Sequence, residues 1–316
     1  MYILSMQNFQ EILQKLCRDY GLVIQERLVL EPNSSGVYAA LNNDGVYRVL
    51  DSQGRSLVLK VAITKNSIAE IARNRKGYKK LEECGLKWFI PQILFTKVDE
   101  NFAVMLMEYC GENFLNQIRK AENPLGFYAY LIDELTKVYT QSKQKGKEGE
   151  QMISSVIAMI KELYEGHISA HLDKSRFLAE RVARIESCID LSHLDFCCFS
   201  SWDFTPENIF LTPNGLKYID PHENVLGIPI IDMACFAGLI KVYDLPQSKE
   251  GYSMLREFAL TKILSILNIP EKLAYKLFFL GRVLQCFLSA KFRVNSNLNQ
   301  ARKIFLEGKM FLEKIT

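Results

Sequence analysis

Several features that would mark particular protein classes are missing from this chain of 316 residues. None of its eight cysteines forms a C-x-x-C pair, so we expect no zinc site, and three of its four histidines have no partners at metal-ligand spacing. The net charge is only +3 and basic residues are mixed with acidic ones, which argues against a nucleic-acid partner. No run approaches the roughly 18 unbroken apolar residues of a membrane span, and the most apolar stretch, 228–240, contains Asp232.

The remaining composition is that of an ordinary globular protein, with 48% hydrophobic and 24% charged residues. The first residues contain no basic segment before a hydrophobic core, so we expect no secretory signal and a cytoplasmic protein. Most cysteines lie in apolar runs, as buried and reduced thiols do. The length exceeds a single typical core, which predicts two lobes.

The first third of the chain is predicted to be mostly β. It contains an amphipathic helix, a second helix that ends at Gly85, and short apolar runs separated by turn residues. We predict the helices at 6–19 and 67–84, strands at 91–98 and 102–109, and further strands among the short β-rich runs 22–30, 37–41, 46–49 and 57–63. Residues 1–110 are therefore expected to form a small lobe with a five-stranded sheet.

Residues 111–316 are predicted to form a larger, mostly helical lobe, which makes the fold class α+β. An apolar repeat of three to four residues predicts helices at 127–140, 152–164, 177–188, 254–267, 271–290 and 299–314. The polar segment 141–151 is expected to be a solvated loop. The exception to the helical pattern is a strand pair between Asp203 and Asp220.

This strand pair is the most informative part of the sequence. Asp203 and Asn208 precede the strand that starts at 209, an Asn-Gly turn follows at 214–215, and Asp220 ends the second strand. Carboxylate and amide oxygens are the ligands that Mg²⁺ takes when it shares them with substrate phosphates. Phosphoryl transfer also needs a carboxylate that accepts the proton of the acceptor hydroxyl.

Lys60 is the second informative residue, because it is a lone lysine among the apolar residues of 57–63. A buried ammonium group is costly unless it is paired, so the sequence predicts an anionic partner. Glu70 on the following helix is the expected partner, and Asn74, Gly77 and Leu81 share its helical face. Glu82 and Glu83 are alternatives but lie too near the helix end.

Four motifs in this order resemble the aminoglycoside phosphotransferase and small-molecule kinase group of the protein-kinase-like fold. They are Val58-Leu-Lys-Val61, Ser201-Trp-Asp-Phe-Thr-Pro-Glu-Asn208, Ile219-Asp-Pro221 and Gly227-Ile-Pro-Ile-Ile-Asp-Met-Ala234. The resemblance spans nearly the whole chain. It implies a bilobal fold, ATP or GTP and Mg²⁺ as cofactors, and a small-molecule hydroxyl acceptor.

The resemblance also implies a role for each matching residue. Asp203 would be the catalytic base, Asn208 and Asp220 the metal ligands, and Lys60, with Glu70, the contact to the phosphates. The backbone of Glu108 and Cys110 would meet the nucleotide base. Asp232 would brace the catalytic segment and take no part in the chemistry.

The loop that would cover the phosphates is open to more than one interpretation. Asn42-Asn43-Asp-Gly45 lies between two short strands and matches the family's first hairpin, but a plain turn fits this composition nearly as well. The segment Asn33-Ser-Ser-Gly36 is a second candidate.

The sequence departs from the family in ways that leave two functional hypotheses. Ser201 replaces the usual histidine and Ile228 replaces an aspartate, while the metal-binding residues remain. Only residues 221–231 separate Asp220 from Asp232, too few for a peptide-binding activation segment. We therefore expect a kinase for an aminoglycoside, sugar, amino-sugar or choline-like alcohol. The alternative is a pseudokinase that binds nucleotide or a partner without transfer; the sequence indicates no oligomeric state.

Overall fold

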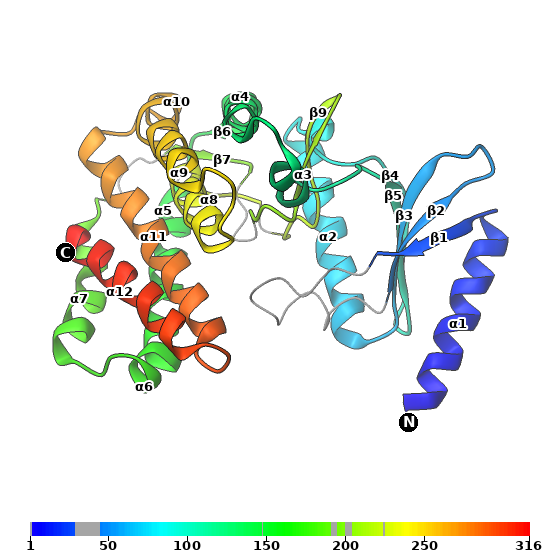
Figure 1. Cartoon of the computed structure of the whole chain (residues 1–316), viewed down its shortest axis with the longest axis horizontal. Coiled ribbons are helices and arrows are strands. Elements are labelled where there is room, and N and C mark those ends of the chain that lie inside the picture. Colours follow the sequence, from blue (N-terminus) through cyan, green and yellow to red (C-terminus); the bar gives the residue numbers. More distant parts are fainter. Residues whose placement is uncertain (1, 29–44, 147, 191–194, 200–203, 224) are drawn as a thin grey trace.

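The computed structural model describes the chain except residues 1, 29–44, 147, 191–194, 200–203 and 224. Figure 1 shows a sheet with two helices on one side of the molecule and a larger group of helices on the other. The five-stranded antiparallel sheet has the order β1-β2-β3-β5-β4. Its strands are β1 (Val23–Arg27), β2 (Gly45–Leu50), β3 (Ser56–Ala62), β4 (Ile93–Val98) and β5 (Ala103–Glu108). The predicted α+β bilobal class is confirmed, whereas the predicted strand 37–41 lies outside the described residues.

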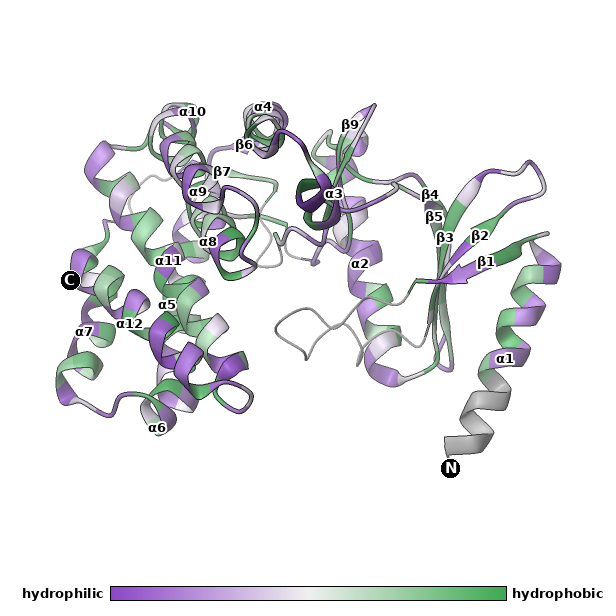
Figure 2. Ribbon diagram, viewed as in Figure 1, coloured by the Kyte–Doolittle hydropathy of each residue, from purple (hydrophilic) through white to green (hydrophobic). Residues whose placement is uncertain are grey.

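One helix packs on each face of the sheet. On α1 (Tyr2–Asp19), which carries alternating hydrophobic and hydrophilic bands in Figure 2, Phe9 and Leu13 share a core with Leu57, Leu59 and Val61 of β3. The other β3 face packs with α2 (Lys65–Glu83) in the main core. Because side chains alternate along a strand, Lys60 lies on the α2 side of the sheet.

The ends of α2 are set by local hydrogen bonds. The Thr64 hydroxyl accepts the Ser67 N–H at 3.4 Å, which caps the first turn. At the other end Gly85 has φ +78°, and the Leu86 N–H donates to Leu81 O at 2.9 Å. This left-handed ending favours glycine, so the predicted helix stop at Gly85 is confirmed.

The second lobe is built from helices around a buried pair. Helix α8 (Pro229–Val242) packs along α11 (Glu271–Arg293). Within the described part of the chain, α11 is the one helix long and apolar enough to suit a membrane, but 72% of that stretch is buried inside the protein, as in a core helix. The other helices are α3 (Phe114–Lys120), α4 (Pro124–Ser142), α5 (Glu148–Leu163), α6 (Ser169–His171), α7 (Arg176–Cys188), α9 (Ser248–Glu257), α10 (Leu264–Leu267) and α12 (Leu298–Ile315), with shorter or wider turns η1 (Lys87–Phe89), η2 (Tyr164–Ile168) and η3 (Phe258–Ile263).

The polar segment 141–151 is the clearest difference from the sequence-based expectation. It is not a continuous loop: α4 extends to Ser142, β6 (Lys143–Gln144) pairs with β7 (Phe196–Cys197), and α5 begins at Glu148. The Lys143 ammonium lies 2.9 Å from the Asp195 carboxylate. These partners are distant in sequence, so local polarity gave no sign of them.

Candidate active site

A β-hairpin brings two of the predicted metal ligands together. Strands β8 (Ile209–Thr212) and β9 (Gly215–Tyr218) pair with Ile209 opposite Tyr218. The pairing continues for one step, because the Ile219 N–H donates to Asn208 O at 3.0 Å. Asn208 and Asp220 therefore lie at the same open end of the hairpin, as the motif order predicts.

The turn at the closed end lies one residue earlier than expected. Its central residues are Pro213 and Asn214, and Gly215 begins β9 with φ +105°. Only glycine takes this backbone angle without strain, so Gly215 is required by the strand start instead of by the turn centre.

Asp220 adopts a left-handed backbone conformation with φ +57°. For a residue other than glycine this conformation costs about 1–2 kcal/mol, and it persists only when the surroundings hold it. Two contacts do so. The Asp220 N–H donates to the Tyr78 hydroxyl at 3.1 Å, and its carboxylate forms an ion pair with Lys60.

The Lys60–Asp220 ion pair joins the two lobes. Lys60 is only 3% exposed, so the predicted burial of this lysine is confirmed. The Asp220 side chain remains 21% exposed, which leaves part of the carboxylate accessible. A buried ammonium on the sheet thus faces a partly open carboxylate at the hairpin end.

One face of α2 packs directly on the backbone that follows Asp220. The Asn74 amide donates to Pro221 O at 3.3 Å. A Cβ on Gly77 would lie 2.6 Å from the same oxygen, so only glycine allows this approach. Burial, and then the Asp220 charge, raise the pKa of Tyr78 well above its ordinary value, which keeps its hydroxyl protonated. The neutral hydroxyl accepts from Asp220 and donates to Met107 Sδ at 3.8 Å.

Aromatic side chains that precede and follow Asp203 in the sequence pack together beside the hairpin. Asp203 itself lies outside the described residues, as do Ser201 and Trp202. Phe199 and Phe204, 1% and 2% exposed, contact each other edge-on with ring centroids 5.3 Å apart, and both contact Tyr218. The chain therefore enters and leaves 200–203 from one aromatic cluster beside the hairpin.

Polar side chains fix the hairpin to its neighbours. The Gln117 amide donates to Leu211 O at 2.8 Å, and the Glu134 carboxylate accepts the Leu216 N–H at 3.3 Å. The Lys217 ammonium donates to Trp88 O and Ile90 O at 2.9 and 3.0 Å, which links the hairpin to the segment between α2 and β4. None of these anchors was predicted from the sequence.

The predicted nucleotide-base contacts lie where the sheet leads into the helical lobe. Glu108 ends β5, and its carboxylate accepts the Gln92 N–H at 3.0 Å. Cys110 is half-buried; burial, and then the Glu108 charge, raise its pKa to about 12. Its thiol is therefore neutral, so this strand end offers backbone groups and an uncharged surface.

The other predicted nucleotide residues are only partly described. Asn42 and Asn43 lie outside the described residues. Gly45 begins β2, where a Cβ would lie 2.8 Å from the Phe9 ring, so its small size serves the packing of α1. Glu70 lies on α2 with Oε2 shielded from solvent, but its pairing with Lys60 stays a prediction, because the contact established for Lys60 is the one to Asp220.

Asp232 lies in the first turn of α8 and is 4% exposed. Burial raises the pKa of Tyr139 and the Asp232 charge raises it further, which places this carboxylate near α4. The position agrees with a bracing role inside the lobe.

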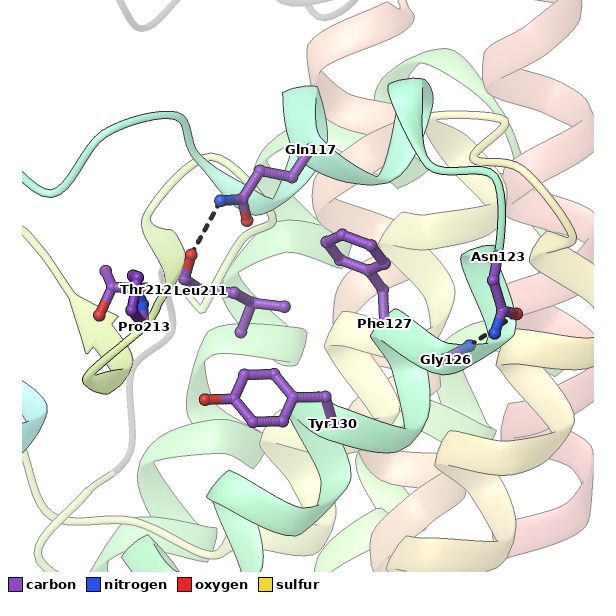
Figure 3. A pocket seen from close by; sticks show the side chains of 8 residues that line it. All are labelled: Gln117, Asn123, Gly126, Phe127, Tyr130, Leu211, Thr212 and Pro213. Atoms are coloured by element: carbon purple, nitrogen blue, oxygen red, sulfur yellow. Dashed lines mark hydrogen bonds between the residues drawn. The ribbon is translucent and has the colours of Figure 1, made fainter.

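A separate pocket lies at the closed end of the hairpin. It has a volume of about 480 Å³ and is bounded by α3, α4 and the β8–β9 turn (Figure 3). Phe127, Tyr130 and Leu211 supply its apolar wall, and Gln117 and Thr212 its polar groups. None of the described site residues lines it, so it is distinct from the Lys60–Asp220 site.

Solved structures share this fold at low sequence identity, whereas no family model and no curated protein matches the sequence. A protein described as a fructosamine-3-kinase, from Haemophilus somnus 129PT, is 12% identical with a TM-score of 0.55, covering 98% of this chain and 99% of that one. The GDP and kanamycin complex of APH(2")-IIIa is 13% identical with a TM-score of 0.56, covering 92% and 93%. The macrolide 2'-phosphotransferase MphH from Brachybacterium faecium is 11% identical with a TM-score of 0.54, covering 97% and 98%. The chain therefore has the bilobal fold of small-molecule phosphotransferases, which confirms the predicted resemblance at the level of the fold.

The side chains at the open end of the hairpin suit a hard divalent cation. Asp220 supplies a carboxylate and Asn208 an amide oxygen, the ligand types that Mg²⁺ prefers. Within the described ranges, no three His, Cys, Asp or Glu side chains are placed to hold a metal ion together. A metal site built from such residues alone is therefore absent from these ranges. A magnesium ion that takes its other ligands from phosphates and water fits this small donor set.

Proposed function

We propose that this protein is a small-molecule O-phosphotransferase that uses ATP or GTP with Mg²⁺. The observation that carries the proposal is the Lys60–Asp220 pair across the two lobes, in a fold shared with small-molecule phosphotransferases. Structural neighbours include complexes with ADP and streptomycin and with GDP and kanamycin. For this chain we propose that the protein binds the nucleotide and Mg²⁺, transfers phosphate to a hydroxyl acceptor, and acts in the cytoplasm.

Each lobe has a separate task in this proposal. Residues 1–110 bind the nucleotide, through the backbone of Glu108 and Cys110 and through a phosphate-covering turn at Asn42, Asn43 and Gly45. Residues 111–316 carry the catalytic segment and bind the acceptor.

Lys60 and Asp220 orient the phosphates between them. The ammonium group, held by Glu70, contacts the phosphate oxygens, and Asp220 with Asn208 holds the Mg²⁺. When bound, the ion neutralises charge on the transferred phosphoryl group. The partly exposed Asp220 carboxylate and the buried Lys60 ammonium suit these roles because a phosphate–metal unit offers each group a partner of opposite charge.

Asp203 accepts the proton of the acceptor hydroxyl. Phe199 and Phe204, on either side of this segment, contact each other in the aromatic cluster beside the hairpin. Asp232 supports the segment from within the lobe.

The test is a transfer assay with a panel of aminoglycosides, sugars, amino-sugars and choline-like alcohols, using ATP or GTP with Mg²⁺. We expect Asp203→Ala to abolish transfer and to retain nucleotide binding, measured as a rise in melting temperature. Full transfer by Asp203→Ala would refute the proposed base. Nucleotide binding without transfer to any acceptor would favour the pseudokinase hypothesis.

A further inference from the structure

Two cysteine thiols from different lobes are neighbours in this structure. Cys84 is the C-terminal cap of α2, and Cys198 follows β7 in the segment that leads to Asp203. Burial raises the pKa of the Cys198 thiol, and the nearby Cys84 side chain raises it further. Both cysteines are reduced.

The backbone near each cysteine is held by the end of one helix. Gln141, near the end of α4, donates to Gly85 O at 2.7 Å, directly after Cys84. The next residue, Ser142, accepts the Cys198 N–H at 3.0 Å. The Trp88 indole N–H donates to the Gln141 side chain at 2.9 Å and fixes it. The end of α4 therefore holds the chain at Gly85 and at Cys198, which brings the two cysteines near each other.

Four other thiols donate to oxygen acceptors. Cys197 donates to Tyr139 O at 3.5 Å, Cys110 to Glu108 O at 3.9 Å, Cys235 to Gly281 O at 3.2 Å and Cys286 to the Gln285 side chain at 3.7 Å. Cys197 is adjacent in sequence to Cys198, yet its thiol bonds to a different element. An oxidant is therefore expected to distinguish between these neighbours.

We propose that Cys84 and Cys198 are a site of oxidative modification at which a peroxide forms a reversible disulfide between the two lobes. The half-exposed Cys84 thiolate attacks a peroxide oxygen, the O–O bond breaks, and with hydrogen peroxide water leaves, giving a sulfenic acid. Cys198 sulfur then attacks the Cys84 sulfur, the S–O bond breaks and a second water leaves. The two thiols lose two hydrogens and two electrons in total, and the peroxide is reduced to two waters.

The environments of the two cysteines set this order of events. Cys198 is 3% exposed, and burial raises its pKa to about 12, so it is a poor first target for a dissolved oxidant. The nearby Lys80 charge acts in the opposite direction and favours the Cys198 thiolate. Cys84 meets the oxidant and Cys198 completes the bond.

The crosslink would connect α2 to the strand end before the catalytic segment. Helix α2 also carries Asn74 and Gly77, which pack on Pro221. A disulfide that closes so long a loop restricts the unfolded chain and should raise thermal stability. Its formation does not depend on the phosphotransfer proposal.

The experiment treats the reduced full-length chain with hydrogen peroxide and maps disulfides by mass spectrometry without reduction. Trypsin separates 81–87, which holds Cys84, from 185–217, which holds Cys188, Cys197 and Cys198. Cys198→Ser and its matched control Cys197→Ser identify the partner. Cys84→Ser, at a half-exposed helix cap, provides a variant for which folding is not at risk.

We expect a crosslink between 81–87 and 185–217 in the wild type and in Cys197→Ser, lost in Cys84→Ser and Cys198→Ser and reversed by dithiothreitol. Oxidation should raise the melting temperature by several degrees in the wild type and not in Cys84→Ser. If Cys84 is oxidised to the sulfinic acid without a crosslink, or if Cys197→Ser removes the crosslink and Cys198→Ser does not, the proposal is overturned.

Discussion

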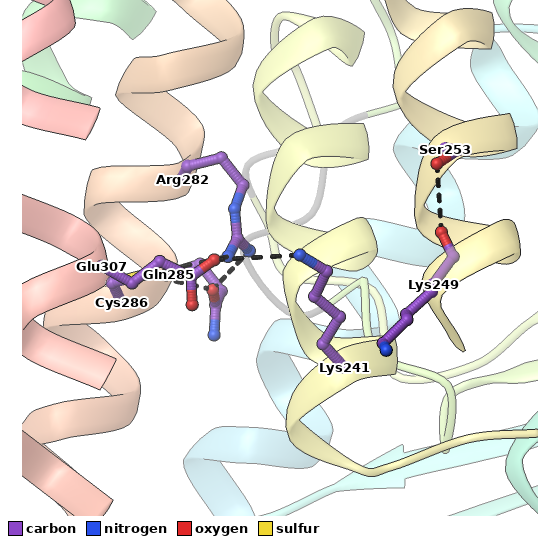
Figure 4. Close-up of polar contacts among 7 residues, drawn as sticks. All are labelled: Lys241, Lys249, Ser253, Arg282, Gln285, Cys286 and Glu307. Atoms are coloured by element: carbon purple, nitrogen blue, oxygen red, sulfur yellow. Dashed lines mark hydrogen bonds and ion pairs between the residues drawn. The ribbon is translucent and has the colours of Figure 1, made fainter. Parts of the chain in front are cut away.

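Two of the cationic side chains that the protein buries almost completely differ in their surroundings. Lys60 is 3% exposed and Arg282, on α11, is 1% exposed. Lys60 forms its ion pair with the partly open Asp220 of the other lobe. Arg282 donates to Gln285 at 2.6 Å and to Glu307 at 2.9 Å, as Figure 4 shows.

The comparison shows that burial of a charge does not by itself mark a functional site. Arg282 also lies over the rings of Tyr252 and Phe311, at 5.6 and 5.1 Å from their centroids, and its guanidinium occupies the space above Gly238. These contacts use the guanidinium to join α8, α11 and α12. Lys60 instead pairs with a residue of the other lobe, Asp220, which has a strained backbone, and this is typical of a site that binds a ligand.

The largest expected effect is on activity, at Lys60. Lys60→Met should lower the rate of phosphoryl transfer by about 10²–10³, because a charge positioned on the phosphates is lost. The melting temperature should fall only modestly, because Asp220 loses its ion-pair partner but is still partly exposed to water. The control is Lys97→Met on β4, whose lysine is 52% exposed and pairs with Asp99, and which should leave the rate unchanged. If Lys60→Met loses its fold and the remaining folded protein transfers phosphate normally, the role of Lys60 is structural and the proposed contrast with Arg282 is wrong.

Arg282 should show the opposite pattern. Arg282→Ala removes a large buried side chain and should lower the free energy of unfolding by about 3 kcal/mol. Transfer per folded molecule should not change. Arg256→Ala on α9, at an exposed position, is the control and should change the free energy of unfolding by less than about 0.5 kcal/mol. Denaturant unfolding measures both, and a rate loss in folded Arg282→Ala would contradict a purely structural role.

The next effect lies between the two lobes, at Gly77. Gly77→Ala places a Cβ against Pro221 O and should cost about 2 kcal/mol, with weaker binding of Mg²⁺–nucleotide because the Asp220 segment is displaced. Gly166→Ala is the matched helical control, since nothing lies within 4 Å of its Cβ position. Thermal unfolding with and without nucleotide separates the two effects. Equal stability of the two variants would disprove the close packing of α2 on this segment.

The smallest effect is expected at Asp173, far from the site. Burial raises the pKa of Asp173, but hydrogen bonds from Ser175 and Lys309 outweigh this and hold it below its ordinary value. Its stabilising contribution is therefore present above the unfolded pKa of about 3.9 and is lost as the pH falls through the lowered folded value. Asp173→Asn should lose about 1 kcal/mol at pH near 7 and less in acid. A difference that does not shrink in acid would show that the ion pair with Lys309 is not its source.

The sequence predicted the Lys60 side of this comparison and missed the Arg282 side. Lys60, Asn208 and Asp220 stand out because each interrupts an apolar or strand pattern at a motif position. Arg282 lies within a predicted helix. Its spacing with Gln285, Ser289 and Arg293 places these buried polar residues on one helix face, and only this spacing could have indicated a row of polar residues inside the protein.

Contacts between distant residues were the part that could not be predicted. The pairing of Lys60 with Glu70 stays a prediction. The sequence did not indicate the ion pair of Lys60 with Asp220, because a nearby helix is visible in the sequence and the return of the chain from the other lobe is not. Tyr78 was missed for the same reason, because its contact with the site is one hydrogen bond that its hydroxyl accepts from the Asp220 backbone N–H.

Binding of Mn²⁺, in place of Mg²⁺, tests the account most directly. Electron paramagnetic resonance of Mn²⁺ with ATP should show tight binding to the wild type and, in Asp220→Asn, an affinity at least about tenfold lower with the fold retained. Equal affinity of both proteins for Mn²⁺–ATP would contradict the claim that Asp220, facing Lys60, holds the metal of a phosphotransferase.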